Sequence, residues 1–178
     1  ISACLVGSEM CIRDRVEGVP AHSSQVFTKD IGAGAIYEAA RIINGFYEAL
    51  SSEENLTFNP GMILGGTSVE HDKEMDGGSA YGKSNIVAKY TVVTGDIRAI
   101  SPEQLKKTQD VMRAIVVKHR PQTKAEISFG EGYPPLAPVK GNYDLLSHFN
   151  KVSNDLGFGS VTAVNPRDAG AAAVSYTH

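Results

Sequence analysis

Hydrophobic and polar positions alternate along the chain in patterns that predict strands and helices in turn. A short β-compatible stretch, residues 15–19, comes first. From Thr28 or Asp30, either of which can cap a helix, apolar residues recur at three- and four-residue steps as far as Leu50. That spacing is typical of an amphipathic helix, which needs a sheet or another helix to cover its apolar stripe. The predicted stripe consists of Ile36, Ala39, Ala40, Ile43, Phe46, Tyr47 and Leu50.

Two strands joined by a polar loop are predicted next. Residues 56–69 and residues 85–99 are rich in β-branched and aromatic side chains, the composition of half-buried strands. We expect these two strands to pair antiparallel. Residues 70–83, between them, are polar and glycine-rich, and the pattern predicts the exposed loop of a hairpin.

A second helix and a last strand follow. Ser101 and Gln104 can form a capping box around Pro102 at the first helical position, a combination that indicates a helix start. The helix is expected to end at residues 118–121, where basic residues precede a proline. Residues 124–129 then alternate between apolar and polar side chains, which predicts a half-buried strand.

The resulting order, β-α-β-β-α-β over about residues 14–130, predicts an α+β fold. It is the order of a ferredoxin-like sandwich, in which two helices cover one face of a four-stranded antiparallel sheet. The second strand would lie at an edge, so residues 57–64 would carry unpaired backbone groups that edge-to-edge pairing with a second copy can satisfy.

The whole chain divides into three segments. Residues 1–15 show no sustained period and resemble read-end artefacts of environmental sequence assemblies, as do the last five residues; we expect them not to be native. Residues 16–130 form the sandwich. Residues 131–178 begin with a proline-rich connection and are expected to form a partial α/β segment, with a helix from Asn142 to Gly157 and a strand at residues 160–164. The chain is therefore interpreted as an internal fragment.

Composition excludes several classes of partner. The 178 residues carry 21% charged residues and a net charge of -3, so neither a nucleic acid nor a membrane surface is an expected partner. No apolar run approaches the roughly 20 residues that span a bilayer, and we expect a soluble chain of undetermined compartment. Cys4 and Cys11 fit neither a disulfide framework nor a zinc knuckle.

Three side chains are candidates for chemistry. His22 lies between a Pro-Ala turn and two serines, where an imidazole can donate a hydrogen bond to a developing oxyanion; the alternative is a surface or cap histidine. Arg98, near the end of the long strand, can fork onto a carboxylate or merely pair with Asp96. Asn85 can offer its amide to a substrate or only shape a turn.

Two other motifs are interpreted as structural. Residues 77–84 (GGSAYGKS) match the phosphate-loop pattern, but charged residues precede them and a β-branched stretch follows, so the strand and helix that phosphate binding needs are missing. His71, Asp72 and Glu74 cluster in the predicted loop and are expected to be solvated rather than metal-bound. His119, His148 and His178 are assigned no role.

Taken together, the motifs resemble a known family of zinc aminoacylases and carboxypeptidases. The resemblance rests on residues 18–24 (GVPAHSS), on residues 65–67 (GGT) followed by Asn85, on residues 95–98 (GDIR), and on the segment after Pro134. The family includes glutamate carboxypeptidase, succinyl-diaminopimelate desuccinylase and acetylornithine deacetylase. It implies that residues 16–130 are a dimerisation or lid domain and that residues 131–178 begin the return to a two-zinc catalytic domain.

The resemblance also implies roles and partners. His22 would cross the interface of a homodimer and polarise the scissile carbonyl in the partner's active site, while Asn85 and Arg98 would hold the carboxylate end of the substrate. Two zinc ions are implied, but their ligands and the general base would lie outside this chain, so no metal ligand is assigned. Ala173 stands where the family has an aspartate.

The predicted function is therefore a fragment of a zinc-dependent metallopeptidase or amidohydrolase. The whole enzyme would cleave an amide bond of an N-acyl amino acid or a small peptide, and the fragment alone is expected to be inactive. The alternative is a stand-alone ferredoxin-like binding or regulatory module without catalysis.

Overall fold

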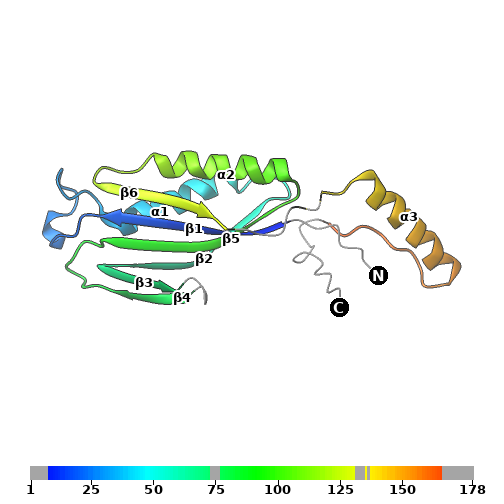
Figure 1. Cartoon of the computed structure of the whole chain (residues 1–178), viewed down its shortest axis with the longest axis horizontal. Coiled ribbons are helices and arrows are strands. Elements are labelled where there is room, and N and C mark those ends of the chain that lie inside the picture. The colour runs from blue at the N-terminus through cyan, green and yellow to red at the C-terminus, as the bar shows by residue number, and fades with distance from the viewer. Residues whose placement is uncertain (1–7, 73–76, 131–134, 136, 166–178) are drawn as a thin grey trace.

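The computed structural model describes residues 8–72, 77–130, 135 and 137–165. These residues form a four-stranded antiparallel sheet, two helices against it, a small hairpin, and a third helix set apart (Figure 1). The elements are β1 (Ser8–Gly18), α1 (Gly34–Leu50), β2 (Thr57–Gly66), β3 (Ser68–Asp72), β4 (Gly77–Tyr81), β5 (Tyr90–Ala99), α2 (Pro102–Val117), β6 (Thr123–Phe129) and α3 (Lys140–Asp155).

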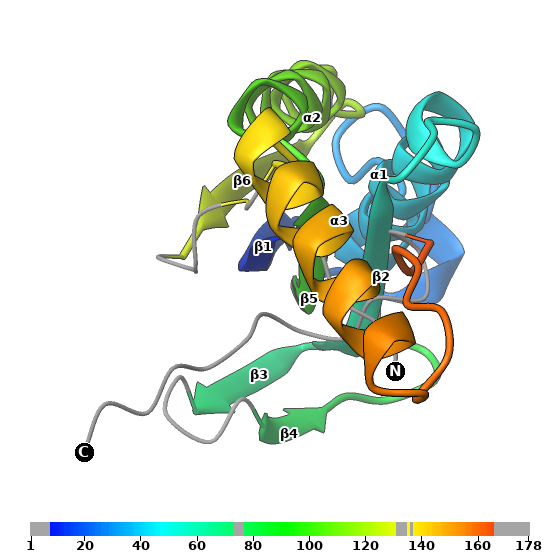
Figure 2. The ribbon, with the colours of Figure 1, turned by 90° about the vertical axis from the view of Figure 1, so that its right-hand side faces the viewer.

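The sheet has the strand order β2-β5-β1-β6, which confirms the predicted ferredoxin-like sandwich. Strand β1 pairs with β5 from Ser8 opposite Ala99 to Glu17 opposite Tyr90, and β6 covers its other edge. Figure 2 shows α1 and α2 on one side of the sheet and the hairpin β3–β4 on the other side. As predicted, β2 lies at one edge; β6, with exposed Lys124, Glu126 and Ser128, forms the other.

Two element starts differ from the sequence-based expectation. The first strand begins at Ser8 and not near residue 15, because its backbone pairs with the full length of β5 even where its side chains show no alternating pattern. Helix α1 begins at Gly34 and not at residue 28 or 30. The Thr28 hydroxyl donates to Gln25 O and helps to form a compact turn before the helix.

The apolar stripe of α1 is rotated from the predicted one. Ala39, Phe46 and Leu50 are buried as expected, but Ile36, Ala40 and Tyr47 are exposed. Ile36 lies over Gly65 at the β2 edge, where an added Cβ would approach its side chain to 2.9 Å. The buried face instead consists of Gly34, Ala35, Glu38, Ala39, Ile42, Phe46 and Leu50.

Glu38 is a fully buried carboxylate that joins three elements. Arg41 Nε donates to both of its oxygens at 3.1 Å, and the backbone N–H of Arg120 donates to Oε2 at 3.1 Å. Arg41 also donates to Ile115 O at the end of α2. Because each oxygen is hydrogen-bonded, the charge is compensated inside the sandwich, and Glu38 ties α1 to α2 and to the loop between α2 and β6.

The predicted polar loop contains strands of its own. Within residues 70–83 and just before them, β3 pairs antiparallel with β4, from Ser68 opposite Tyr81 to Asp72 opposite Gly77. The hairpin packs against β2, since an added Cβ at Gly78 would meet the Leu64 side chain at 2.9 Å. The following strand is correspondingly shorter than expected and begins at Tyr90, and it pairs antiparallel with β2 as predicted.

Helix α2 confirms its predicted start, and α3 corrects its own. The Ser101 hydroxyl accepts from Gln104 N at 3.1 Å, while the Gln104 side chain accepts from Ile100 N. In α3, Asn142 lies inside the first turn and its side chain accepts from Val139 N.

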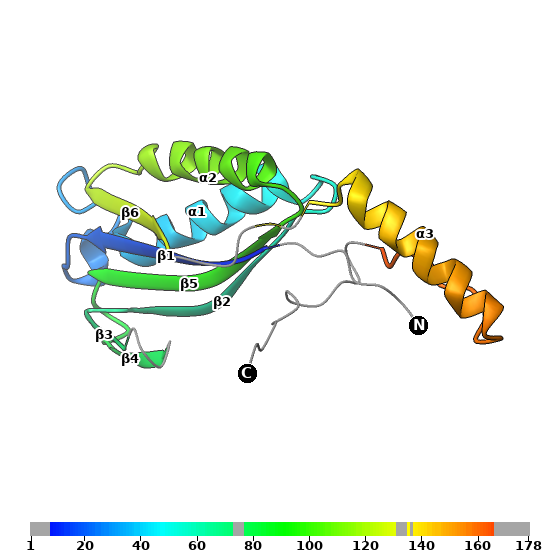
Figure 3. The ribbon, with the colours of Figure 1, turned by 45° about the vertical axis from the view of Figure 1, so that its right-hand side comes forward.

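Helix α3 lies away from the sandwich, with Leu145 71% exposed (Figure 3). Residues 160–164 form no strand, and Ala173 lies outside the described residues.

Asp14 is buried on the helix-facing side of β1. Its side chain lines a cavity of about 20 Å³ together with Ile43, Phe46 and Val93, and its Oδ1 has no hydrogen-bond partner. Burial raises the pKa of Asp14 from 3.8 to about 7. Asp14 is thus a carboxylate buried without a hydrogen bond to Oδ1, and it lies within residues 1–15, which we expect not to be native. That expectation stays a prediction.

We predict that the stability of the chain falls as the pH rises through the range set by Asp14. The folded-state pKa of about 7 exceeds the ordinary value of 3.8, so proton binding favours the folded state. The contribution of Asp14 to the free energy of unfolding should be largest below about pH 4 and decline by at most about 4 kcal/mol toward pH 8. Asp14→Val should remove this decline in denaturant titrations, and an unchanged pH dependence would contradict the assignment.

Candidate functional site

The turn that carries His22 packs against the segment that carries Asn85. Beyond β1, Ala21 O accepts from Val87 N, and Ser23 N donates to Asn85 O, both at 2.8 Å. His22 and Ile86 form an isolated antiparallel bridge between these contacts. The structure therefore brings together two of the three predicted site residues, from segments that are far apart in the sequence.

Two glycines allow this close approach. A Cβ on Gly18 would lie 2.8 Å from Ala35 N, so β1 can reach the start of α1 only without a side chain there. Gly34 has a φ of +79°, and a Cβ on it would lie 2.5 Å from Val87. Glycine meets both demands, the left-handed backbone and the missing volume. The base of the His22 turn is thereby fixed by backbone contacts.

Ser24 orients the imidazole of His22. The Nδ1 atom accepts a hydrogen bond from Ser24 N at 3.2 Å and lies 2.9 Å from the Ser24 hydroxyl. A backbone N–H can only donate, so the neutral ring carries its proton on Nε2. His22 is exposed, and it can therefore offer an Nε2–H to an oxygen outside the domain. The sequence alone assigns Ser24 no role of its own, although a His-x-Ser spacing at a turn is the signal for this contact.

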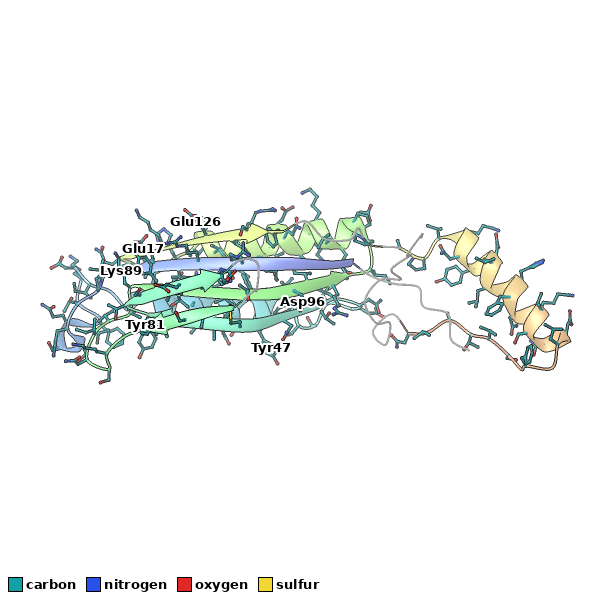
Figure 4. All side chains as sticks on the ribbon, turned by 60° about the horizontal axis from the view of Figure 1, so that its bottom comes forward. Glu17, Tyr47, Tyr81, Lys89, Asp96 and Glu126 are labelled. Carbon is teal, nitrogen blue, oxygen red and sulfur yellow. The ribbon has the colours of Figure 1, made fainter. Side chains whose placement is uncertain are left out.

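Arg98 lies at the other end of β5. It pairs opposite Thr57, and its Nε donates to Asp96 Oδ2 at 3.1 Å. Figure 4 shows Asp96, in β5, well apart from Lys89, the residue before the strand. From Tyr90 to Arg98 the strand extends roughly 25 Å. Within one chain, Arg98 therefore lies at the opposite end of the sandwich from His22 and Asn85.

The rejected motifs remain outside this arrangement. In residues 77–84 the first five form β4, and no helix follows them, so the phosphate-loop context is absent there. Within the described ranges, no three His, Cys, Asp or Glu side chains group as a metal site. In the same ranges, no helix has the length and apolar character to cross a bilayer. Glu74 lies outside the described residues.

The fold and the turn define a class of protein: a ferredoxin-like domain that presents a hydrogen-bonding turn at one end. The sequence pattern of the family described as "Peptidase dimerisation domain" matches residues 9–124. The chain belongs to this family. The match includes His22, Asn85 and Arg98, and it extends into the segment before residue 16.

Solved structures share the fold at low sequence identity. A tripeptidase from Staphylococcus aureus matches with a TM-score of 0.65 and 22% identity, over 93% of this chain and 41% of that one. An amidase of the hydantoinase/carbamoylase family from Burkholderia phymatum matches with a TM-score of 0.67 and 15% identity, over 96% of this chain and 38% of that one. The aminopeptidase PepT from Bacillus cereus matches with a TM-score of 0.65 and 14% identity, over 97% of this chain and 42% of that one.

The chain thus spans about two fifths of the length of these solved proteins. At such identities the matches establish the fold. No curated protein sequence is significantly similar to the chain.

We predict that neutral His22 carries its proton on Nε2. In a ¹⁵N-resolved NMR spectrum of the 178-residue chain, Nδ1 should give the downfield signal of an unprotonated ring nitrogen, because Ser24 N–H donates to it. His119, whose Nδ1 lies against the Arg120 carbonyl, serves as the contrasting ring and should carry its proton on Nδ1. A proton found on Nδ1 of His22 would rule out the inferred geometry.

Proposed function

We propose that the chain is the dimerisation domain of a zinc-dependent hydrolase that cleaves an amide bond of an N-acyl amino acid or a small peptide. Membership of the peptidase dimerisation family supports this, as do solved structures of peptidases and amidases with the same fold. The observation that carries the proposal is the exposed His22 ring, whose Nδ1 accepts from Ser24 N and whose Nε2–H can therefore donate to an acceptor outside the domain. A carbonyl that gains negative charge during hydrolysis is such an acceptor.

The zinc ions of this proposal would be held by catalytic segments outside the described residues. Among the described residues, no three His, Cys, Asp or Glu side chains group as a metal site. Bound zinc would supply the nucleophilic water. The contribution of this chain is to bind and orient the substrate. His22 donates to the carbonyl oxygen, Asn85 offers its amide, and Arg98 can donate two hydrogen bonds to a substrate carboxylate in a forked pair.

The direction of the chain indicates which subunit each residue serves. Strand β1 starts opposite Ala99, and the last residue of β6, Phe129, pairs with Ile12, so both connections of the sandwich leave it near Arg98. The catalytic segments of the same subunit would therefore join at the Arg98 end. His22 lies at the opposite end, roughly 25 Å away along β5, and is available to the active site of a second subunit.

A two-fold dimer can place these residues in one site. Two β2 edges that pair antiparallel put the Arg98 end of one subunit beside the His22 end of its partner. Ile36 and Ile63 are about half exposed beside this edge and would be covered. Each site would then combine Arg98 from one subunit with His22 and Asn85 from the other, in a homodimer.

We predict that His22→Ala in the full-length enzyme lowers kcat by roughly a hundredfold, as the loss of one oxyanion donor does. Steady-state kinetics measure the effect. His119→Ala is the matched control, because His119 is an exposed histidine at the end of α2, and it should leave kcat unchanged. A His22→Ala enzyme with full activity would leave that residue only the role of a turn residue.

We predict that two inactive variants complement each other. In a heterodimer of His22→Ala and Arg98→Ala subunits, one site receives both substitutions and the other receives neither. Random mixing should restore about a quarter of the wild-type activity, since half of the dimers carry one intact site in two. Activity of the mixture that stays at the level of the separate variants would place both residues in the site of a single subunit.

A further inference from the structure

Phe27 presents an exposed aromatic ring in the loop that follows the His22 turn. The residue is 67% exposed and its ring meets that of Tyr37, itself 54% exposed, edge to face with centroids 5.5 Å apart. Aromatic pairs of this geometry are favourable, and exposed aromatic side chains are enriched where proteins contact each other. We call these two residues the aromatic pair.

The backbone holds Phe27 in an unfavourable conformation. Its φ of 71° lies in the left-handed region, which is unfavourable for a bulky residue. Phe27 N donates to Gly32 O, and Gly32 N donates to Thr28 O, both at 2.8 Å. The Gln122 side chain fixes the same loop by donating to Lys29 O. A conformation imposed by its surroundings, which leaves an apolar ring in solvent, brings no benefit to the isolated domain and indicates a function.

The aromatic pair is coupled to His22 through the backbone. Gln25 N donates to His22 O at 2.9 Å, and Thr28 N donates to Gln25 O at 3.2 Å. Successive hydrogen-bonded turns therefore join the imidazole to Phe27. A surface that binds the aromatic pair would also position the His22 ring.

We propose that the aromatic pair is an apolar contact for the catalytic half of a second subunit and that this contact steadies His22 at the active site there. The proposal rests on the proposed function. The sandwich connects to its own catalytic segments at the Arg98 end, which leaves the end with the aromatic pair for another subunit. Solved proteins of this fold are more than twice as long as the chain, so a second copy would bring a large body to this end.

The test removes the ring and keeps the fold. Asparagine tolerates left-handed backbone, so Phe27→Asn should not lower the thermal unfolding midpoint of the 178-residue chain and should leave its His22 tautomer unchanged. In the full-length enzyme it should lower kcat/KM about tenfold, the effect of losing one well-packed interface residue. Phe27→Gly, which suits this φ still better, should do the same, and Phe27→Tyr should retain activity because it keeps the ring.

Subunit mixing identifies the partner. Phe27→Asn subunits mixed with Arg98→Ala subunits should regain activity, because one site of the heterodimer is then intact; mixed with His22→Ala subunits they should not. Full activity of Phe27→Asn alone, or a changed His22 tautomer in its isolated chain, would overturn the inference. If His22→Ala is inactive while Phe27→Asn is fully active, only this inference fails. If His22→Ala is fully active, the proposed function fails.

Discussion

The antiparallel pairing of β1 with β5 is the constraint on which the rest of the domain depends. These two central strands fix the register of the sheet, since a slip by one residue would turn Val16 and Ile97 from the core to the opposite face. The same pairing places Glu17 opposite Tyr90 and Ser8 opposite Ala99. It thereby sends the His22 turn to one end of the sandwich and both chain connections to the other end.

Local patterns were sufficient for much of the fold. The Ser101 cap and the alternating residues of β6 follow from short-range rules, and the edge position of β2 follows from the order of the elements; the structure confirms each of them. The face of α1 did not follow, because a carboxylate can lie inward once Arg41 and the Arg120 backbone bind it. Hydrophobic periodicity treats Glu38 as a surface residue, and only the fold reveals its partners.

The candidate site residues were proposed from resemblance, and their spacing in the sequence alone did not bring them together. Nothing in the sequence pattern alone places Asn85 beside His22, because their contact is made by backbone atoms of two irregular segments. The distance of Arg98 from His22 and Asn85 could not be predicted either, because it depends on the register of β5. The orientation of the imidazole depends on a single backbone N–H at Ser24. The direction of such hydrogen-bond donors can be predicted only when the tertiary contacts are known.

The two edges of the sheet differ in a way that limits assembly. The β2 edge has a register shift between Pro60 and Met62, and proline offers no N–H there, so a continuous ladder cannot run along its whole length. The β6 edge carries alternating charged and polar side chains at Lys124, Glu126 and Ser128. Charges on an outer strand discourage strand addition. Growth of the sheet through β2 would therefore stop at two copies, which protects a self-pairing domain from forming filaments.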